Sequence, residues 1–206
     1  HVRAMMRQDP DVIMVGEARD QETMEVSFRA ALTGHLVLTS MHANDAPSAT
    51  TRMLQMGVEP YLVSSGLRAV LAQRLVRRVC PDCKVSRRVE EVLADAPALQ
   101  RRLAEHRITV VAEGTGCPRC RQTGFYGRIG LFELMHMTPT LKQMVLDAVD
   151  ERAMRDTAVS EGMVPMVGDA MAKLRAGVIG VEGLLQLYAD MSTEYGKAAM
   201  EILGAS

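Results

Sequence analysis

The segment Asp11–Asp45 constrains the fold more than any other part of the chain, because its pattern is typical of a strand, a turn, a helix and a second strand. Val12–Val15 is a short apolar run between a proline and a glycine, typical of a strand buried on both faces of a parallel sheet. Gln21–Leu32 carries a helical pattern that a glycine ends, and Leu36–Met41 is a second apolar strand. The segment therefore predicts an α/β fold with parallel strands.

Two titratable residues follow the ends of these strands. Glu17 comes just after the first strand and its glycine, and His42 comes just after the second. Ligands of open α/β sheets bind at the carboxyl ends of the strands, so both side chains are expected on one functional rim. From spacing alone, Glu17 could equally be a solvated turn residue. Each histidine of this segment would more often be a hydrogen-bonded structural residue than a catalytic one.

Distances along the strands separate other candidates from this rim. A strand rises by about 3.3 Å per residue, so Asp11 lies about 20 Å from Glu17 and cannot share a magnesium ion with it. The same estimate places His35 about 20 Å from His42. We therefore expect His35 to make structural or subunit-interface contacts.

Composition narrows the class of protein. The chain of 206 residues has a formal net charge of -1, which gives no general attraction to nucleic acid or anionic lipid. No apolar run approaches the ~18 residues needed to span a bilayer, and no signal peptide opens the chain. We expect a cytoplasmic protein, and two CxxC pairs in that compartment indicate metal binding rather than disulfides.

The four cysteines form two knuckles, Cys80–Cys83 and Cys117–Cys120. Four thiolates in this arrangement suit tetrahedral Zn²⁺, and a site with four protein ligands has no open position, so its role is structural. Disulfides or free thiols are the alternatives. The 33 residues between the pairs exceed the usual ribbon spacing. An inserted substructure must return the chain, and the helical pattern of residues 90–107 is the candidate.

The motifs resemble those of a known family. RQDPDVIMVGEARD (Arg7–Asp20) resembles the Walker B segment of the hexameric secretion ATPases, and TGHLVLTSMHANDA (Thr33–Ala46) resembles their histidine box. CPDC and GCPRCRQTGFYGRIGLFEL are similar to the type II secretion and type IV pilus assembly branch, which the chain resembles up to about Tyr188. Ala18 stands where the family usually has a larger apolar residue.

The resemblance implies a carboxyl-terminal part of a RecA-like parallel-sheet ATPase domain, followed by a zinc subdomain and a helical tail. The expected divisions are residues 1–79 for the ATPase part, 80–135 for the tetracysteine zinc subdomain, 136–190 for the helical subdomain and 191–206 for an unassigned tail.

The resemblance also implies roles for residues. Glu17 would polarise the attacking water and help to hold Mg²⁺, and His42 would sense the γ-phosphate of ATP. Arg19 and His35 would make nucleotide or interface contacts. The metal ligands would be Cys80, Cys83, Cys117 and Cys120.

The implied assembly is a homo-hexamer that couples ATP hydrolysis to pseudopilus or type IV pilus assembly and protein secretion. Its partners would be an inner-membrane platform and cytoplasmic assembly proteins, with no nucleic acid, and it would be cytoplasmic and peripheral to the inner membrane. Retraction motors are a poorer match, because they lack the cysteine pairs.

One motif of such motors is absent from the sequence. The chain contains no G-x-x-x-x-G-K-[ST] loop to bind phosphates, and it starts at His1 rather than at a methionine. We therefore expect the carboxyl-terminal portion of a longer protein, whose Walker A segment lies upstream. The chain alone is expected to be inactive.

Two alternatives remain at this point. A zinc-ribbon module that binds nucleic acid is suggested by a basic cluster, although aromatic residues for stacking are few and acidic residues interrupt it. A zinc-bearing remnant without motor activity is the other. The cluster consists of Arg74, Arg77, Arg78, Lys84, Arg87 and Arg88.

Further helices are expected outside the motifs. Val2–Gln8 and Pro60–Val79 have amphipathic patterns, with apolar residues of the second in helical spacing. A helix that starts near Ala46 is expected to be capped by Asp45 or Ser48. Four helices should fill the region from residue 141 to residue 188. Most of the sixteen methionines should fill irregular gaps in the core.

Overall fold

The computed structural model describes residues 8–190; the predicted helix at Val2–Gln8 and the unassigned tail therefore lie largely or wholly outside the described residues. The chain forms two compact units, each built from two segments. Unit 1 comprises residues 1–72 and 133–164, and unit 2 comprises residues 73–132 and 165–206. The division at residues 79, 135 and 190 stays a prediction, because it follows sequence order whereas the units are defined by contacts.

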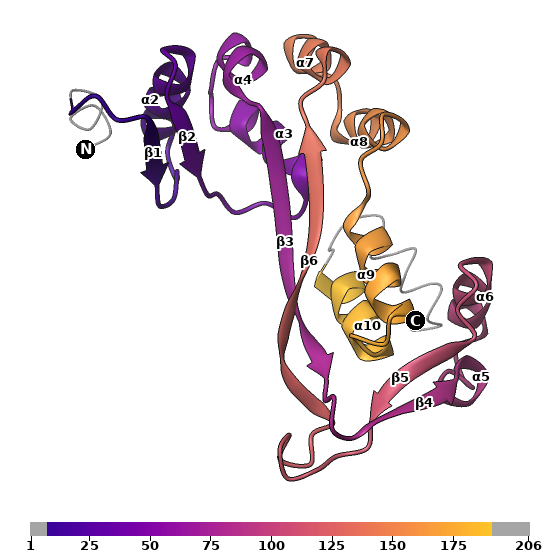
Figure 1. Ribbon diagram of the computed structural model, residues 1–206. Helices are drawn as coiled ribbons and strands as arrows, with labels where there is room; N and C mark the ends of the chain where they lie inside the picture. The colour runs from indigo at the N-terminus through magenta and orange to yellow at the C-terminus, as the bar shows by residue number, and fades with distance from the viewer. Residues whose placement is uncertain (1–7, 191–206) are drawn as a thin grey trace. The chain divides into compact units, whose positions relative to one another are not determined.

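Unit 1 combines a parallel strand pair with helices (Figure 1). Helix α2 connects β1 to β2, and the two strands pair in parallel with Val12 opposite Leu36 and Val15 opposite Thr39. This is the predicted strand–helix–strand unit. Its elements are β1 (Val12–Val15), α2 (Gln21–Leu32), β2 (Leu36–Thr39), α3 (Ala46–Gln55), α4 (Pro60–Gly66), α7 (Pro139–Leu146) and α8 (Glu151–Ser160).

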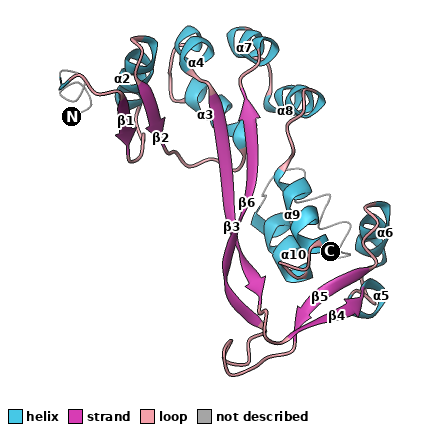
Figure 2. Ribbon diagram, in the orientation of Figure 1, coloured by secondary structure: helices cyan, strands magenta, loops and turns pink. Residues whose placement is uncertain are grey.

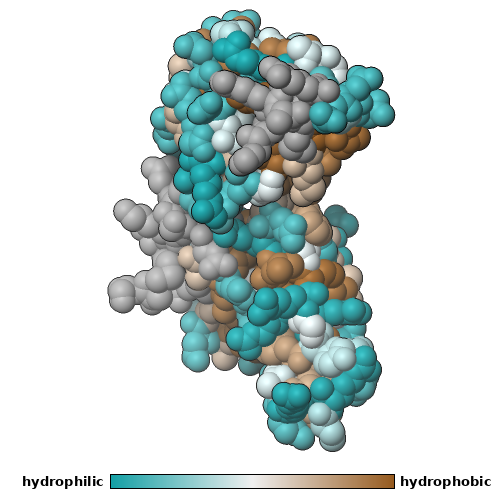
Figure 3. All heavy atoms as spheres, turned by 90° about the vertical axis from the view of Figure 1, so that its left-hand side faces the viewer, coloured by the Kyte–Doolittle hydropathy of each residue, from teal (hydrophilic) through white to brown (hydrophobic). Residues whose placement is uncertain are grey.

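Burial of β1 differs from the prediction. Ile13 and Val15 are buried against Ala30 of α2, but Val12 and Met14 are 54% and 69% exposed. The expectation of a strand buried on both faces was therefore wrong for this structure. Within residues 8–190, only one face of the strand pair is covered, so the side chains that alternate to the other face reach solvent. Figure 3 looks at the side where β1 and β2 lie in Figure 1 and shows apolar residues at the surface among hydrophilic ones.

The main core of unit 1 lies among its helices. Helix α4 contacts both α2 and α7, and α3 contacts α8. Six of the sixteen methionines are buried in this core, where methionine is expected to fill gaps. They are Met24, Met53, Met135, Met137, Met154 and Met163.

The predicted helix over Pro60–Val79 was wrong in its second half. The helix ends at Gly66, and strand β3 (Ala69–Val79) follows. Gly66 packs closely against α2, since a Cβ added at this residue would lie 2.7 Å from Phe28. Exposure alternates along the first residues of β3, as in a strand with one covered face. The strand pairs with β6 (Phe125–His136), a partner distant in sequence, and this pairing outweighs the local helical spacing.

The described residues of unit 2 form a second strand pair and four helices, which Figure 2 shows coloured by type. Strands β4 and β5 pair antiparallel, from Lys84 opposite Gly114 to Arg88 opposite Val110. Helix α9 contacts both α10 and β5. Leu99, Leu131 and Leu174 are among the fully buried side chains of this unit. Its elements are β4 (Lys84–Arg88), α5 (Val89–Val92), α6 (Pro97–Glu105), β5 (Val110–Gly114), α9 (Met166–Arg175) and α10 (Val181–Asp190).

Strands β3 and β6 each run from one unit into the other. The boundary at Ala72 and Gln73 falls inside β3, and the boundary at Phe132 and Glu133 falls inside β6. The four helices predicted between residues 141 and 188 are present as α7 to α10.

Candidate functional site

Glu17 and His42 meet at the carboxyl ends of the two parallel strands. Glu17 follows β1 by two residues and His42 follows β2 by three. The Glu17 Oε1 atom lies 3.0 Å from His42 Nε2. The side chain of His42 is 83% exposed and that of Glu17 is 24% exposed. The structure thus brings together the two residues that the strand pattern places on one rim, and the imidazole remains open to a ligand.

Arg19 occupies the other oxygen of Glu17. Its Nη2 atom donates to Glu17 Oε2 at 2.6 Å, and its side chain is 76% exposed. This hydrogen bond, together with the positive charges nearby, lowers the pKa of the Glu17 carboxyl below its usual value although partial burial opposes the shift. Glu17 is therefore ionised at neutral pH, as a residue that orients water or holds a cation must be.

The two strand-end loops are tied to each other by Ser40. The backbone N–H of Ala18 donates to Ser40 O at 3.0 Å, and the Ser40 hydroxyl donates to Gly16 O at 2.5 Å. These bonds fix the loop that carries Glu17 against the loop that carries His42. Sequence reasoning missed Ser40. A hydroxyl residue directly after an apolar strand is the signal that could have indicated it.

Helix caps position both sides of this loop pair. Asp20 caps α2 by accepting from the Thr23 N–H at 2.8 Å. Asp45 caps α3, and Ser48 returns a bond to the Asp45 backbone, so the prediction of a cap at Asp45 or Ser48 is confirmed with both residues involved. The two caps define the first residues of α2 and α3, and so define where the loops that carry Glu17 and His42 end.

His35 lies away from the rim, at the amino end of β2. Its Nδ1 atom is 3.0 Å from Ala30 O, at the carboxyl end of α2, and 3.1 Å from Thr33 Oγ1. This contact satisfies a helix-end carbonyl and is structural. A further role of His35 at a subunit interface stays a prediction.

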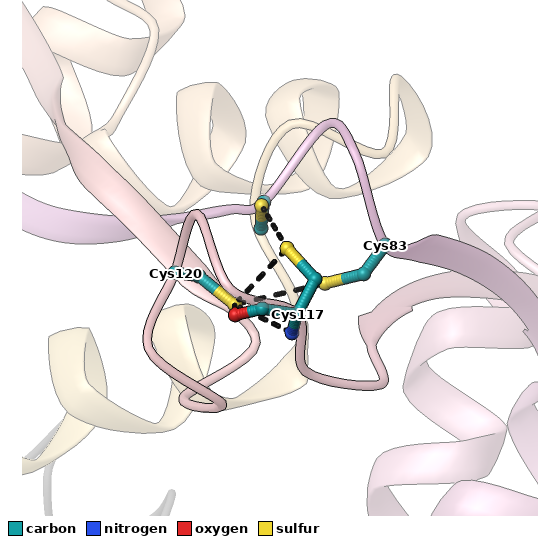
Figure 4. A group of neighbouring side chains, drawn as sticks. Cys83, Cys117 and Cys120 are labelled. Carbon is teal, nitrogen blue, oxygen red and sulfur yellow. Dashed lines mark hydrogen bonds between the residues drawn. The ribbon is translucent and has the colours of Figure 1, made fainter.

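The four cysteines form a second site in unit 2. Their sulfur atoms all lie within 4.8 Å of one another. All four are free thiols. Over residues 8–190 this is the one group of three or more potential ligands of this kind close enough to share an ion. In Figure 4 the sulfurs of Cys83, Cys117 and Cys120 point toward a common centre.

The sulfur spacing fits a tetrahedral metal. The Sγ–Sγ distance is 3.8 Å for Cys80–Cys117, 3.8 Å for Cys83–Cys120 and 3.6 Å for Cys117–Cys120. Zn–S bonds of about 2.3 Å in a tetrahedron require sulfurs about 3.8 Å apart. A disulfide would instead bring one pair to about 2 Å. The donor set and its geometry therefore fit Zn²⁺.

The pKa values of two of the thiols shift in opposite directions. Burial raises the pKa of the Cys83 thiol to about 12. The pKa of Cys120 falls to about 6, because backbone N–H groups of Cys117 and Gly124 donate toward its sulfur and outweigh the opposing effect of burial. Cys117 N lies 3.2 Å from Cys120 Sγ. Such N–H···S bonds favour the thiolate form that binds metals.

The chain returns to the first knuckle through the β4–β5 pair. Residues directly after Cys83 pair with residues just before Cys117, so the antiparallel pair closes the loop between the knuckles. The expected inserted substructure is present, and its helical part consists of α5 and α6. Sequence reasoning missed the strand pair. At the closure, an added Cβ on Gly114 would lie 2.0 Å from Gly124 O.

Comparison with known proteins identifies the family of the chain. A family model described as "Type II/IV secretion system protein" matches residues 1–186. The chain belongs to this family.

Relatives in the secretion family include named ATPases. The type IV pilus assembly ATPase TfpB of Acinetobacter baylyi is 43% identical over 189 residues, which cover 90% of this chain and 32% of that protein. The type II secretion system ATPase E of Vibrio cholerae is 40% identical over 189 residues, which cover 90% of this chain and 36% of that protein. The chain thus spans about a third of the length of these relatives.

Solved structures show the same fold at lower identity. The ATPase DotB of Legionella pneumophila matches with a TM-score of 0.60 and 21% identity, covering 91% of this chain and 41% of DotB. The pilus retraction motor PilT with bound ADP matches with a TM-score of 0.60 and 22% identity, covering 90% of this chain and 42% of PilT. These matches and the parallel β1–β2 pair confirm the α/β prediction, and the assignment to a RecA-like domain stays a prediction.

A membrane-spanning segment is not found in the described part of the chain. Every helix between residues 8 and 190 is too short or too polar to cross a bilayer.

Proposed function

We propose that this chain contributes the strand-end residues of a ring-forming ATPase that couples ATP hydrolysis to pseudopilus or type IV pilus assembly. The observation that carries this proposal is the 3.0 Å contact between Glu17 and His42 at the carboxyl ends of adjacent parallel strands. Membership in the secretion family and relatives named as assembly and secretion ATPases support it. They favour it over a nucleic-acid-binding zinc ribbon.

Each residue of the rim has a proposed task. Glu17 is ionised and orients the attacking water, and its carboxylate helps to hold Mg²⁺. His42 is exposed beside it and donates to the γ-phosphate. Arg19 aligns the carboxylate of Glu17 and can turn to a nucleotide or to a neighbouring subunit. ATP and Mg²⁺, when bound, supply the phosphoryl group and the charge that neutralises it.

The proposal extends to the rest of the machine, as the resemblance to the family implies. The working form is a homo-hexamer at the cytoplasmic side of the inner membrane, with an inner-membrane platform and cytoplasmic assembly proteins as partners. The 206-residue chain lacks a phosphate-binding loop motif and is therefore inactive by itself. It works as part of the complete protein.

The cysteine cluster is proposed to hold one structural Zn²⁺ ion. Four thiolates at tetrahedral spacing leave no open position for water or substrate. The ion would join the end of β3, the start of β4 and the loop before β6. Its role is to hold this part of unit 2 in shape.

Glu17→Gln in the complete protein tests the catalytic role. Without a base to orient water, we expect kcat for ATP hydrolysis to fall by about 100-fold or more, while the affinity for ATP changes by less than about twofold. Phosphate release and equilibrium nucleotide binding are the measurements. Glu105→Gln, which neutralises an exposed carboxylate of α6, is the matched control and should keep full activity. Undiminished turnover in Glu17→Gln would rule out this function for the residue.

A further inference from the structure

Unit 1 contains a buried ion pair that the site described above does not use. Arg155 of α8 and Asp45 at the start of α3 are 8% and 3% exposed. The Arg155 Nη2 atom donates to Asp45 Oδ2 at 2.5 Å and to Glu151 Oε1 at 3.1 Å. The two partners are 110 residues apart in the chain. The pair therefore fixes the start of α3 to α8.

The start of α3 is held from two sides by carboxylates. Asp45 Oδ1 accepts from the Ser48 N–H at 2.9 Å, and Glu133 Oε1, which is almost fully buried, accepts from the Ala46 N–H at 2.9 Å. Pro47 has no N–H. The donors of the first turn are thus all bonded within the protein. This helix end is closed to an outside anion and serves as an anchor.

Arg155 keeps its charge in this environment. Burial works against the charged form, but the hydrogen bond to Asp45 and the two further carboxylates nearby raise the pKa of Arg155 overall. A buried ion pair contributes little net stability compared with apolar residues of similar volume. Stability alone is therefore a weak reason for a buried charge at this position.

The anchor lies close to His42 in the chain. Ser40 is fixed to the loop of Glu17 on one side of His42, and Asp45 is fixed to Arg155 on the other. Four residues lie between these two fixed points, and Met41 among them also packs against the core of unit 1. A segment of four residues can span only a limited distance. The fixed positions of Ser40 and Asp45 together therefore determine where the imidazole of His42 lies.

We propose that Arg155 is a positioning residue, which holds Asp45 so that residues 41–44 present His42 beside Glu17. Its importance for turnover rests on the proposed ATPase function, whereas its effect on the loop does not. Reacting groups displaced by about 1 Å can cost about 100-fold in rate, so a residue outside the site can affect catalysis through position alone.

Two variants of the complete protein test this proposal. Arg155→Lys keeps the charge but removes the guanidinium Nη2 atom that donates to both Asp45 and Glu151, and Asp45→Asn keeps the oxygen that caps α3 but loses the charge. We expect kcat to fall by about tenfold to 100-fold in both, with KM for ATP within about twofold. Amide hydrogen exchange of residues 16–18 and 40–44 should become about tenfold faster, because the two loops lose their common anchor.

Met154→Ala on the same helix is the matched control. Met154 is buried in the core and its truncation lowers the stability of unit 1 without touching Asp45. It should lower the melting temperature at least as much as Arg155→Lys, with kcat and the exchange of residues 40–44 close to the parent values.

The outcomes separate this proposal from the proposed function. Unchanged kcat and unchanged exchange in both anchor variants would overturn it, and so would an equal loss in Met154→Ala. If the parent protein does not hydrolyse ATP, the ATPase proposal fails. The exchange of residues 40–44 then decides by itself whether Arg155 positions the loop.

Discussion

At the scale of single residues, Glu17 has a partner on each carboxylate oxygen. Arg19 donates to one oxygen at 2.6 Å, and His42 lies 3.0 Å from the other. Both partners come from loops directly after strands, so their positions depend on the backbone of the loops. A carboxylate held in this way is ionised and oriented before a nucleotide arrives, which removes part of the cost of organising the site.

Arg19→Gln tests the electrostatic part of this arrangement. The hydrogen bond from Arg19 holds the pKa of the Glu17 carboxyl below its usual value, so removal of Arg19 should raise that pKa toward the usual value. For a carboxyl whose folded pKa is lowered, the stabilisation is present above the unfolded pKa and is lost as pH falls through the folded pKa. The variant should therefore lose stability relative to the parent at neutral pH and match it in strong acid.

Carboxyl-carbon NMR of Glu17 during an acid titration is the measurement. Arg29→Gln is the control, since Arg29 pairs with Glu25 at 3.6 Å on the exposed face of α2 and should leave Glu17 unaffected. A Glu17 pKa that does not move in Arg19→Gln would contradict the assigned cause.

At the scale of elements, the β4–β5 pair and the cysteine loops depend on a close backbone approach. Gly114 ends β5 and faces Gly124 in the loop before β6, and a Cβ on Gly114 would lie 2.0 Å from Gly124 O. The Cys80 N–H donates to the same Gly124 oxygen at 2.9 Å. One backbone group thus links the end of β3, the end of β5 and the second knuckle.

Gly114→Ala should disturb this junction. The added methyl cannot fit without a shift of the Gly124 backbone, so we expect a loss of about 1–3 kcal/mol in the free energy of unfolding and weaker metal binding. Denaturant unfolding and competition with a chelator of known zinc affinity are the measurements. Ser86→Ala, at an exposed position of β4, should stay within about 0.5 kcal/mol. Equal metal affinity in Gly114→Ala and the parent would show that the junction tolerates the methyl.

At the scale of the whole molecule, the two candidate sites belong to different units. Glu17 and His42 lie in unit 1, and all four cysteines lie in unit 2. The core of unit 1 contains no cysteine, so its packing does not depend on the metal. Each unit has its own buried apolar side chains, and unit 2 contains the cysteine cluster in addition.

Metal removal should therefore affect the units differently. The parent protein should contain one zinc ion per chain, and chelation should speed amide exchange of residues 80–85 and 115–124 by about tenfold or more, while α3 and α8 keep their protection. Elemental analysis and exchange mass spectrometry measure both. Cys83→Ser should reproduce the chelated pattern without added chelator. Exchange that chelation leaves unchanged in the cysteine loops would contradict a structural metal.

The sequence by itself determined the features that depend on neighbours along the chain. The strand–helix–strand unit, the cap of α3 at Asp45 with Ser48, and the placement of Glu17 with His42 follow from local residue patterns and from the shared direction of parallel strands. The two CxxC spacings likewise limit the cysteines to a knuckle geometry.

Only the tertiary structure decided the features that depend on distant partners. Residues 69–79 are a strand because β6 pairs with them, although their local spacing is also compatible with a helix. Arg155 meets Asp45 across 110 residues, and no local pattern indicates this contact. Local geometry restricts each segment to a few conformations. The choice among them, and the meeting of side chains from separate elements, comes from the burial and hydrogen bonds that the packed chain alone provides.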